Sequence, residues 1–254
     1  MCRLAAWIGE PQCLAGLVCN PEHGLIAQAR CSREALMDQH PDGAGLLWYG
    51  DGEPAPARYV NAVPAWRDPE LARVAEQSHS ALYLAHVRAA TRAARCLQNC
   101  HPFQHEQLGF MHNGELAGID QLAPALRERC CGTAPPADAT DSELIFCLLR
   151  HYGVRERPAH ALTESVRLIR DTALREQVNY KLRFSAVLSD GERLHVVRYA
   201  SDDAPPSLYS RHTPKGTAFA SEPIGAETEH WHALPVNSLT TATHTGSSTV
   251  PFNP

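Results

Sequence analysis

The sequence predicts a single α+β domain in which a strand comes first, helices fill the middle and strands close the chain. The apolar run from Cys2 to Ile8 is broken by Gly9 and Pro11, which is typical of a buried strand. Residues 119–176 contain apolar residues at helical spacing, and short apolar runs separated by turn residues follow them.

The helices are predicted from apolar residues at helical spacing and from their end signals. Asp68 suits an N-cap, Pro69 suits the first helical position, and Gly153 separates the last two helices. The predicted helices cover residues 21–36, 69–76, 119–129, 141–152 and 159–176.

The strands are predicted from apolar runs that end at turn signals. They cover residues 2–8, 45–49, 81–87, 108–112, 184–188 and 194–199, with short strands near Ser207, Thr217 and Ser238. The strand over 108–112 ends at Asn113-Gly114, a dipeptide that is typical of a hairpin turn. Residues 240–254 lack periodicity and are a candidate loose tail. No repeat or low-complexity linker divides the sequence, so we expect one domain over residues 1–254.

Composition argues against several classes of partner. The chain carries 23 Lys and Arg against 28 Asp and Glu, a balance that predicts no nucleic-acid partner. No segment approaches the roughly 20 apolar residues that span a bilayer, so we expect no membrane insertion. Because Arg3, Glu10 and Pro11 interrupt the apolar start, we interpret it as a strand and not as a signal peptide, and expect a cytoplasmic protein.

The nine cysteines are odd in number and scattered, so a disulfide framework is not expected. Cys96, Cys100, His101 and His105 fall close together and could be read as metal ligands. The CxxC pairing of structural zinc sites is absent there, so we expect no metal and no other cofactor.

Cys2 is the first candidate for chemistry, although its plain interpretation is a small buried side chain in a strand. If the initiator methionine is removed, Cys2 carries both a thiol and a free α-amino group. Their unperturbed pKa values are about 8.5 and about 7.7–8.0, so the two groups can exchange a proton near neutrality. One residue then supplies the nucleophile and the base, and the same amine can protonate the leaving nitrogen.

Acyl transfer also needs oxyanion donors and groups that hold the substrate. The Asn113 amide and the Gly114 N–H are candidate oxyanion donors, against the alternative of an ordinary turn. Arg88 suits a carboxylate held by two hydrogen bonds. Asp141 suits a cationic amine, although a Thr or Asp before an apolar helix is also a routine N-cap. Together these groups describe an α-amino acid whose distal amide is cleaved, such as glutamine.

Several motifs occur together along the chain: Met1-Cys2-Arg3, Asp42-Gly43-Ala44-Gly45, His86 to Thr91, Asn99 to Phe103, Phe110 to Gly114 and Thr140 to Glu143. In this combination the sequence resembles the class II glutamine amidotransferases. The resemblance implies the N-terminal nucleophile hydrolase fold, a four-layer αββα sandwich. It also implies that Cys2 is the nucleophile and that Asn113 and Gly114 form the oxyanion hole.

The same resemblance implies that Arg88 holds the substrate α-carboxylate and Asp141 its α-amino group. Thr91 and His101 would line the same pocket. Ala89 stands where synthase-linked members have tryptophan, which alters one wall of that pocket.

The opening of the chain, with Pro21, His23-Gly24-Leu25 and Gln28, is similar to the γ-glutamyl hercynylcysteine sulfoxide hydrolases of ergothioneine biosynthesis. We therefore expect a small-molecule γ-glutamyl substrate that loses glutamate. Two enzymatic alternatives stay open: a glutaminase subunit that supplies ammonia to a partner synthase, and a glutathione-type γ-glutamyl peptide hydrolase. A non-catalytic γ-glutamyl-binding protein is a further alternative, against which the intact Cys2, Asn113 and Gly114 argue.

Overall fold

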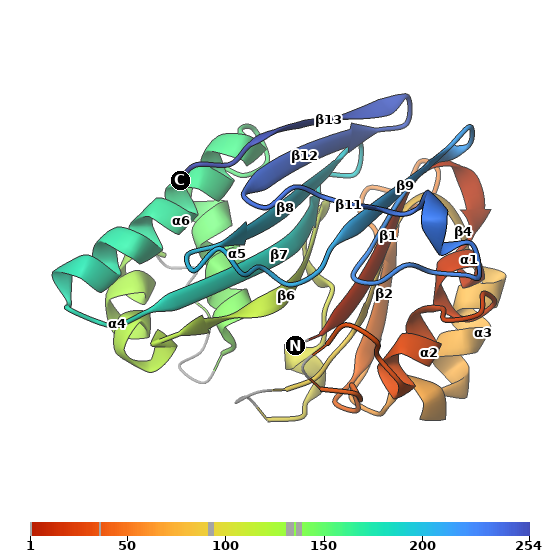
Figure 1. Ribbon diagram of the computed structural model, residues 1–254, viewed down its shortest axis with the longest axis horizontal. Helices are drawn as coiled ribbons and strands as arrows, with labels where there is room; N and C mark the ends of the chain where they lie inside the picture. Colours follow the sequence, from red (N-terminus) through yellow and green to blue (C-terminus); the bar gives the residue numbers. More distant parts are fainter. Residues whose placement is uncertain (1, 36, 91–93, 131–134, 136–138) are drawn as a thin grey trace.

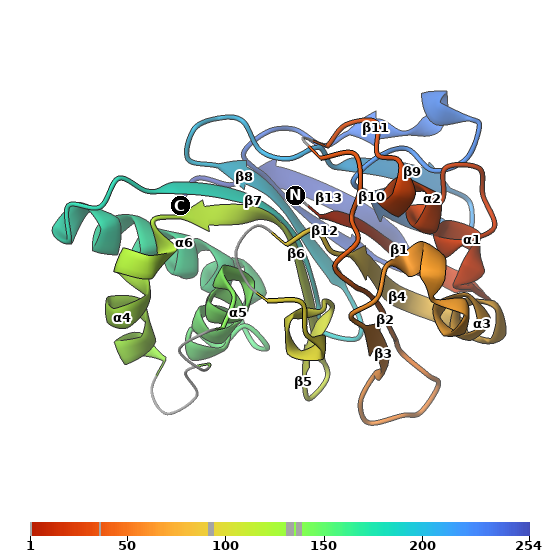
Figure 2. The same cartoon turned by 90° about the horizontal axis from the view of Figure 1, so that it is seen from below.

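The computed structural model describes residues 2–35, 37–90, 94–130, 135 and 139–254. Two antiparallel sheets lie face to face, and helices cover the outer face of each sheet (Figures 1 and 2). The arrangement is the predicted four-layer αββα sandwich. Both views place the beginning of the chain in the middle of the molecule, between the two helical layers.

The first sheet joins the two ends of the sequence. In the described part of the chain its seven strands follow the order β11-β9-β10-β1-β4-β2-β3. Their bounds are β1 (Arg3–Cys13), β2 (Ala44–Trp48), β3 (Ala57–Asn61), β4 (His79–Val87), β9 (Tyr209–Thr213), β10 (Gly216–Ala220) and β11 (His232–Ala233). Helices α1 (Ala15–Val18), α2 (Leu25–Arg30) and α3 (Pro69–Gln77) cover its outer face.

The second sheet carries the longer helices. Its six strands, counted over the described residues, follow the order β13-β12-β8-β7-β6-β5. Their bounds are β5 (Phe103–His105), β6 (Leu108–Ala117), β7 (Lys181–Ser189), β8 (Leu194–Ala200), β12 (Ser238–Thr243) and β13 (Gly246–Pro251). Helices α4 (Ile119–Arg129), α5 (Asp141–His151) and α6 (Pro158–Arg175) pack on it. Short 3-10 turns cover Ala65–Arg67, Leu97–Asn99 and Thr228–His230.

Strand β1 is buried on both faces, which explains why the sequence begins with a nearly continuous apolar run. Leu4 and Ile8 face the second sheet and contact the cluster that contains Met111. Ala5 and Trp7 point the other way, into the helices of the first layer. The alternation follows from the two-residue period of a strand. The predicted end at Ile8 is too early, because β1 continues past a register shift to Cys13.

Most of the long elements are confirmed. Asp68 caps α3 by accepting a hydrogen bond from the Leu71 N–H at 3.2 Å, as its position before Pro69 predicts. The three helices between residues 119 and 176 and the hairpin of β7 and β8 lie where the sequence places them. The helix predicted over 21–36 is wrong in extent, since α2 ends at Arg30.

Two further predictions are wrong. The Asn113-Gly114 dipeptide makes no turn, because β6 runs through it to Ala117 and pairs with β7 along its whole length. The tail is not loose either, because β12 and β13 form a hairpin and Phe252 is buried behind it. Pairing with β7 outweighs the local turn signal at Asn113-Gly114, and the pairing of β12 with β8 attaches the C-terminal hairpin to the sheet. Among the described residues, no helix combines the length and the apolar character needed to cross a membrane.

Gly114 is required by the close approach of β7. A Cβ atom there would lie 1.8 Å from the Arg183 carbonyl oxygen, with φ at +156°. Gly246 has nearly the same φ, +157°, with no atom within 4 Å of such a Cβ.

We expect Gly114→Ala to lower the free energy of unfolding by about 3–5 kcal/mol, because a steric clash adds to the backbone strain. Gly246→Ala is the matched control and should lose only about 1–2 kcal/mol from strain. Urea unfolding of both variants measures the difference. Equal losses would show that the contact with Arg183 is not what requires glycine at position 114.

Candidate active site

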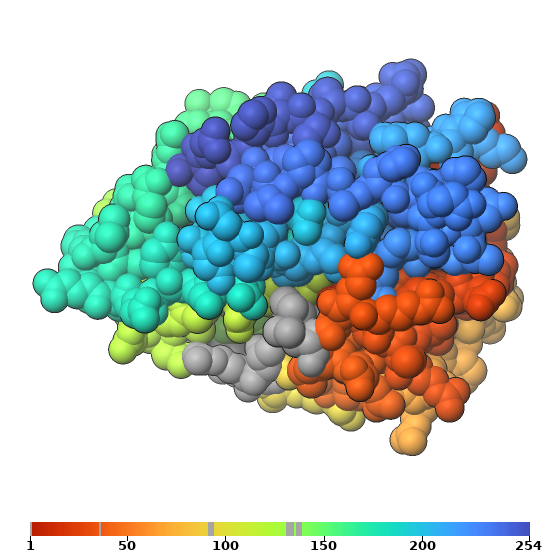
Figure 3. Space-filling view, in the orientation of Figure 1, coloured from red at the N-terminus to blue at the C-terminus, as the bar shows by residue number. Residues whose placement is uncertain are grey.

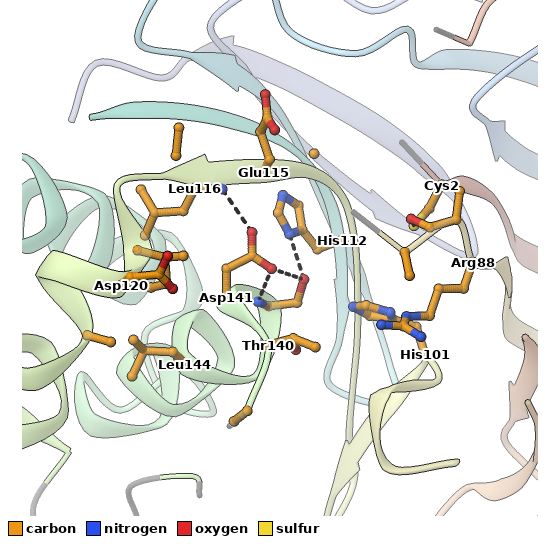
Figure 4. Close-up of a pocket in the computed structure, with 18 of the residues that line it drawn as sticks. Cys2, Arg88, His101, His112, Glu115, Leu116, Asp120, Thr140, Asp141 and Leu144 are labelled. Atoms are coloured by element: carbon orange, nitrogen blue, oxygen red, sulfur yellow. Dashed lines mark hydrogen bonds between the residues drawn. The ribbon is translucent and has the colours of Figure 1, made fainter. Parts of the chain in front are cut away.

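A cavity of about 400 Å³ opens at the N-terminal end of β1. Its wall includes five of the residues that the sequence singled out: Cys2, Arg88, His101, Gly114 and Asp141. Figure 4 shows Cys2, Arg88 and His101 on one side, with Asp141 and Thr140 on the other. The cavity continues beyond Asp141 to α4, where Asp120 and Arg127 line it. Thr91 lies outside the described residues.

Antiparallel pairing brings Cys2 and Arg88 together. Arg3 lies opposite Val87 in the register of β1 and β4, so the residue before β1 and the residue after β4 end at the same edge. The Cys2 thiol contacts the Ala89 carbonyl oxygen, with Sγ and O 3.7 Å apart. Sheet pairing therefore makes neighbours of Cys2, the predicted nucleophile, and Arg88, which is predicted to bind the substrate carboxylate.

The turn before β2 holds the segment that carries Arg88. The Arg88 N–H donates to the Gly43 carbonyl at 2.8 Å, and the Asp42 N–H donates to the Arg88 carbonyl at 3.0 Å. The Asp42 carboxylate accepts from the Ala90 N–H at 2.8 Å and pairs with Arg95. The Asp42-Gly43 motif therefore acts through backbone positioning.

Helix α5 supplies the anionic side of the cavity. Thr140 is its N-cap and forms a reciprocal capping box with Glu143, so Asp141 is free of the capping role that the sequence left open. The Asp141 carboxylate accepts from the Leu116 N–H at 2.8 Å and from the Ser142 N–H at 2.7 Å. These bonds fix the carboxylate between β6 and α5 while it still lines the cavity.

Asn113 is fully buried beside the cavity-lining Gly114. Neither its amide nitrogen nor its amide oxygen has a hydrogen-bond partner among the described residues. Leaving a buried amide unpaired costs about 1–3 kcal/mol, so a native protein that keeps one has a use for it. Asn113 is not itself among the residues that line the cavity, so its role as an oxyanion donor stays a prediction.

Three buried histidines surround the site. His86 and His101 pack with their ring centroids 4.3 Å apart. Burial lowers the pKa of His86 to about 3 and that of His101 well below its usual range. Burial also lowers the pKa of His112, although the nearby Asp141 charge opposes this. All three rings are weak bases, so none of them suits the removal of a thiol proton near neutrality.

His112 links β6, the strand of Asn113 and Gly114, to α5, the helix of Asp141. Its Nε2–H donates to the Arg183 carbonyl at 3.0 Å, which leaves Nδ1 to accept from the Ser142 hydroxyl at 2.9 Å. Ser142 was not singled out from the sequence, because nothing local distinguishes it from other residues in the first turn of a helix.

Burial raises the pKa of the Cys2 thiol. The positive charge of the N-terminal amine, the hydrogen bond to the Ala89 carbonyl and the charges of Arg88 and Arg3 oppose this rise without outweighing it. A thiol with a raised pKa needs a base close by before it can attack. Around Cys96 and Cys100 the structure gives no metal site, since the described residues contain no group of three potential ligands placed to hold an ion.

Residues 12–223 match the family model described as glutamine amidotransferases class-II. This match covers most of the sequence. The chain belongs to the class II glutamine amidotransferase family. The match begins after Cys2, so it does not itself assign the nucleophile.

Two curated relatives of this class II amidotransferase chain span nearly all of it. It is 28% identical to the probable glutamine amidotransferase DUG3 of Saccharomyces cerevisiae, over 95% of this chain and 81% of the relative. It is also 28% identical to the gamma-glutamyl-hercynylcysteine sulfoxide hydrolase of Mycolicibacterium smegmatis, over 94% of each chain.

Solved structures support the same family fold. The glutamine aminotransferase class-II domain protein from Silicibacter pomeroyi superposes with a TM-score of 0.77 at 28% identity, over 99% of this chain and 100% of that one. The glutamine PRPP amidotransferase of B. subtilis, at 16% identity and a TM-score of 0.68, shares the fold over 100% of this chain and 49% of its own. The class II amidotransferase chain thus has the predicted N-terminal nucleophile hydrolase architecture.

The neutral state of His86 predicts a pH dependence of stability. The unfolded chain protonates this ring near pH 6.5, whereas the folded chain does so only near pH 3. The unfolded state therefore binds the extra proton between these values, and acid lowers stability across that window. We expect His86→Gln to reduce the slope of unfolding free energy against pH by up to about 1.4 kcal/mol per pH unit.

Urea unfolding between pH 7 and pH 4 measures this slope. The control is His79→Gln, on the same strand but exposed, which should leave the slope unchanged. An identical slope in His86→Gln and the parent protein would mean that folding does not lower the pKa of His86.

Proposed function

We propose that this protein hydrolyses γ-glutamyl amide bonds with Cys2 as an N-terminal nucleophile. The observation that carries the proposal is the composition of one cavity wall: the thiol, the Arg88 cation and the Asp141 anion all line it. A γ-glutamyl group presents a carboxylate and an ammonium at one end and the scissile carbonyl at the other. Arg88 suits the carboxylate, Asp141 suits the ammonium, and Cys2 then faces the carbonyl carbon.

In the proposed first step the free α-amino group of Cys2 takes the thiol proton, and Sγ attacks the γ-carbonyl carbon. The need for this amine is supported by the raised pKa of the Cys2 thiol and the weak basicity of His86 and His101. The carbonyl oxygen becomes an oxyanion that the Asn113 amide and the Gly114 N–H stabilise. The Cys2 ammonium then protonates the leaving nitrogen, and the C–N bond breaks to leave a thioester.

The second step hydrolyses this thioester. The amine, neutral again, takes a proton from a water molecule that attacks the thioester carbon. The C–S bond breaks, glutamate leaves and the thiol recovers its proton. The α-amino group of Cys2 therefore carries the proton in both steps, because Cys2 supplies both the nucleophile and the base.

For the substrate we propose γ-glutamyl hercynylcysteine sulfoxide, the conjugate of ergothioneine biosynthesis. The Mycolicibacterium smegmatis relative supports this choice because the alignment covers 94% of both chains. The resemblance of the opening of the chain, with His23-Gly24-Leu25 and Gln28, adds to this support. The second candidate is release of ammonia from glutamine for a partner synthase, which the name of the yeast relative supports. A glutathione-type peptide substrate is the third.

We expect Cys2→Ala to lower kcat at least about 1,000-fold while the unfolding midpoint stays close to that of the parent protein, because the nucleophile is lost and little volume changes. Cys31→Ala, at an exposed cysteine, is the matched control and should keep full activity. Retention of Met1 should also abolish activity by capping the amine, as intact mass and glutamate release together would reveal. An active Cys2→Ala protein would disprove the mechanism.

Glutamate release from glutamine, glutathione and γ-glutamyl hercynylcysteine sulfoxide, measured in parallel, tests the substrate. We expect kcat/KM for the sulfoxide conjugate to exceed the others at least about tenfold, since a pocket that binds the leaving group adds about 1.4 kcal/mol or more. A preference for glutamine would favour the ammonia donor. No release from any of the three would contradict the proposed function itself.

A further inference from the structure

Behind Cys2, on the side away from the cavity residues described above, lies a buried carboxylate that the mechanism does not use. Glu222 is 1% exposed and follows β10, the strand next to β1. The backbones continue in contact beyond the strand, because the Ser221 N–H donates to the Leu4 carbonyl at 2.9 Å. This places Glu222 next to Arg3.

Arg3 is fully buried and links Glu222 to Cys2. Its Nε–H donates to the Cys2 carbonyl oxygen at 2.6 Å, and its terminal nitrogen donates to a Glu222 carboxylate oxygen at 3.1 Å. The guanidinium is planar and rigid, so the hydrogen bond from its terminal nitrogen to Glu222 also sets the direction of the Nε–H that reaches Cys2. Fixing the carboxylate therefore fixes the carbonyl of Cys2.

Glu222 is itself held from the opposite side. The Arg33 and Glu34 N–H groups each donate to its carboxylate at 3.0 Å, as do the Ser32 hydroxyl and His23 Nε2, the latter at 2.8 Å. Burial raises the pKa of Glu222, but these hydrogen bonds outweigh it and lower the pKa to about 2. The carboxylate is thus charged, and the segment after α2 encloses it.

This enclosure explains why the predicted helix over 21–36 stops early. Of the N–H groups that would continue the helix, that of Ser32 donates to the Asp38 carbonyl, and those of Arg33 and Glu34 donate to Glu222. Figure 3 shows the surface result, with red and orange N-terminal residues directly against the blue C-terminal ones. Two distant parts of the sequence therefore meet at one buried charge.

We infer that Glu222 is a positioning residue that orients Cys2 through Arg3. Once Met1 is removed, Cys2 is attached to the chain by one peptide bond only, and its thiol makes a weak contact at 3.7 Å. The hydrogen bond from the Arg3 Nε–H to the Cys2 carbonyl oxygen, at 2.6 Å, is the shorter of the described contacts of Cys2. A buried Arg needs a counter-charge to stay ionised in place, which Glu222 supplies. The inference rests on the proposed function only for its effect on turnover.

The first test is kinetic. We expect Glu222→Gln to lower kcat about 10- to 100-fold with KM within about twofold, because misplacing the nucleophile harms the reaction more than binding. Arg3→Lys keeps the cation but cannot bridge both partners, and should do the same. The double variant should be no slower than Arg3→Lys alone, since both changes break one chain of contacts. Independent, additive losses would indicate general structural damage and would overturn the inference.

The second test needs no substrate. The buried Arg3 Nε–H should give a slowly exchanging ¹H–¹⁵N signal, assigned by its disappearance in Arg3→Lys. Glu222→Gln should speed its exchange at least about tenfold, by the loss of about 1.4 kcal/mol or more of local stability. This result would stand even if no γ-glutamyl compound were cleaved. Unchanged exchange would overturn the inference.

Glu34→Gln is the matched control for both tests. Its exposed side chain contacts the Tyr209 hydroxyl, while its backbone N–H still reaches Glu222. It should leave kcat and the Arg3 signal unchanged. If Glu222→Gln does not fold, the kcat of Arg3→Lys decides: a value equal to that of the parent protein would refute the role of the Arg3 bridge.

Discussion

The beginning of the chain forms the centre of a sheet, and the rest of the molecule depends on that constraint. Strand β1 lies between β4 and β10 and is covered by side chains on both faces. A chain end is ordinarily free to move, whereas the proposed role of Cys2 as a nucleophile requires a position held within a fraction of an ångström. Central placement resolves this conflict, because sheet pairing starts at Arg3, directly after Cys2.

The site is built from backbone contacts between elements that are distant in sequence. The turn at Asp42 holds the segment of Arg88, and β6 holds the carboxylate of Asp141. Burial lowers the pKa of the three histidines around the site, so the charged groups among the described residues that line the cavity are carboxylates and guanidinium groups. They are Arg88, Glu115, Asp120, Arg127 and Asp141. Opposite charges in one cavity are what the proposed zwitterionic substrate group requires.

The architecture is shared more widely than the proposed activity. The PRPP amidotransferase structure that superposes at 16% identity shares the fold, and fold alone does not determine what is cleaved. The local features to compare are Ala89 in the wall beside Cys2 and the groups that donate hydrogen bonds to the Glu222 carboxylate. These positions are where comparison within the family will be informative.

Apolar periodicity is a local signal, so the sequence by itself determined most helices and strands, and the family resemblance carried by its short motifs implied the sandwich. Five of the residues that these motifs contain line the cavity: Cys2, Arg88, His101, Gly114 and Asp141. Tertiary structure alone decided that Asn113 and Gly114 continue a strand, that the C-terminal residues form a hairpin, and that a helix stops at Arg30. Strand β7 and Glu222 are distant in sequence from the residues they affect, and the C-terminal hairpin joins the sheet only through the pairing of β12 with β8. The proposed role of Glu222 could not be predicted for the same reason: its contacts lie about 190–220 residues away, and no local pattern records them.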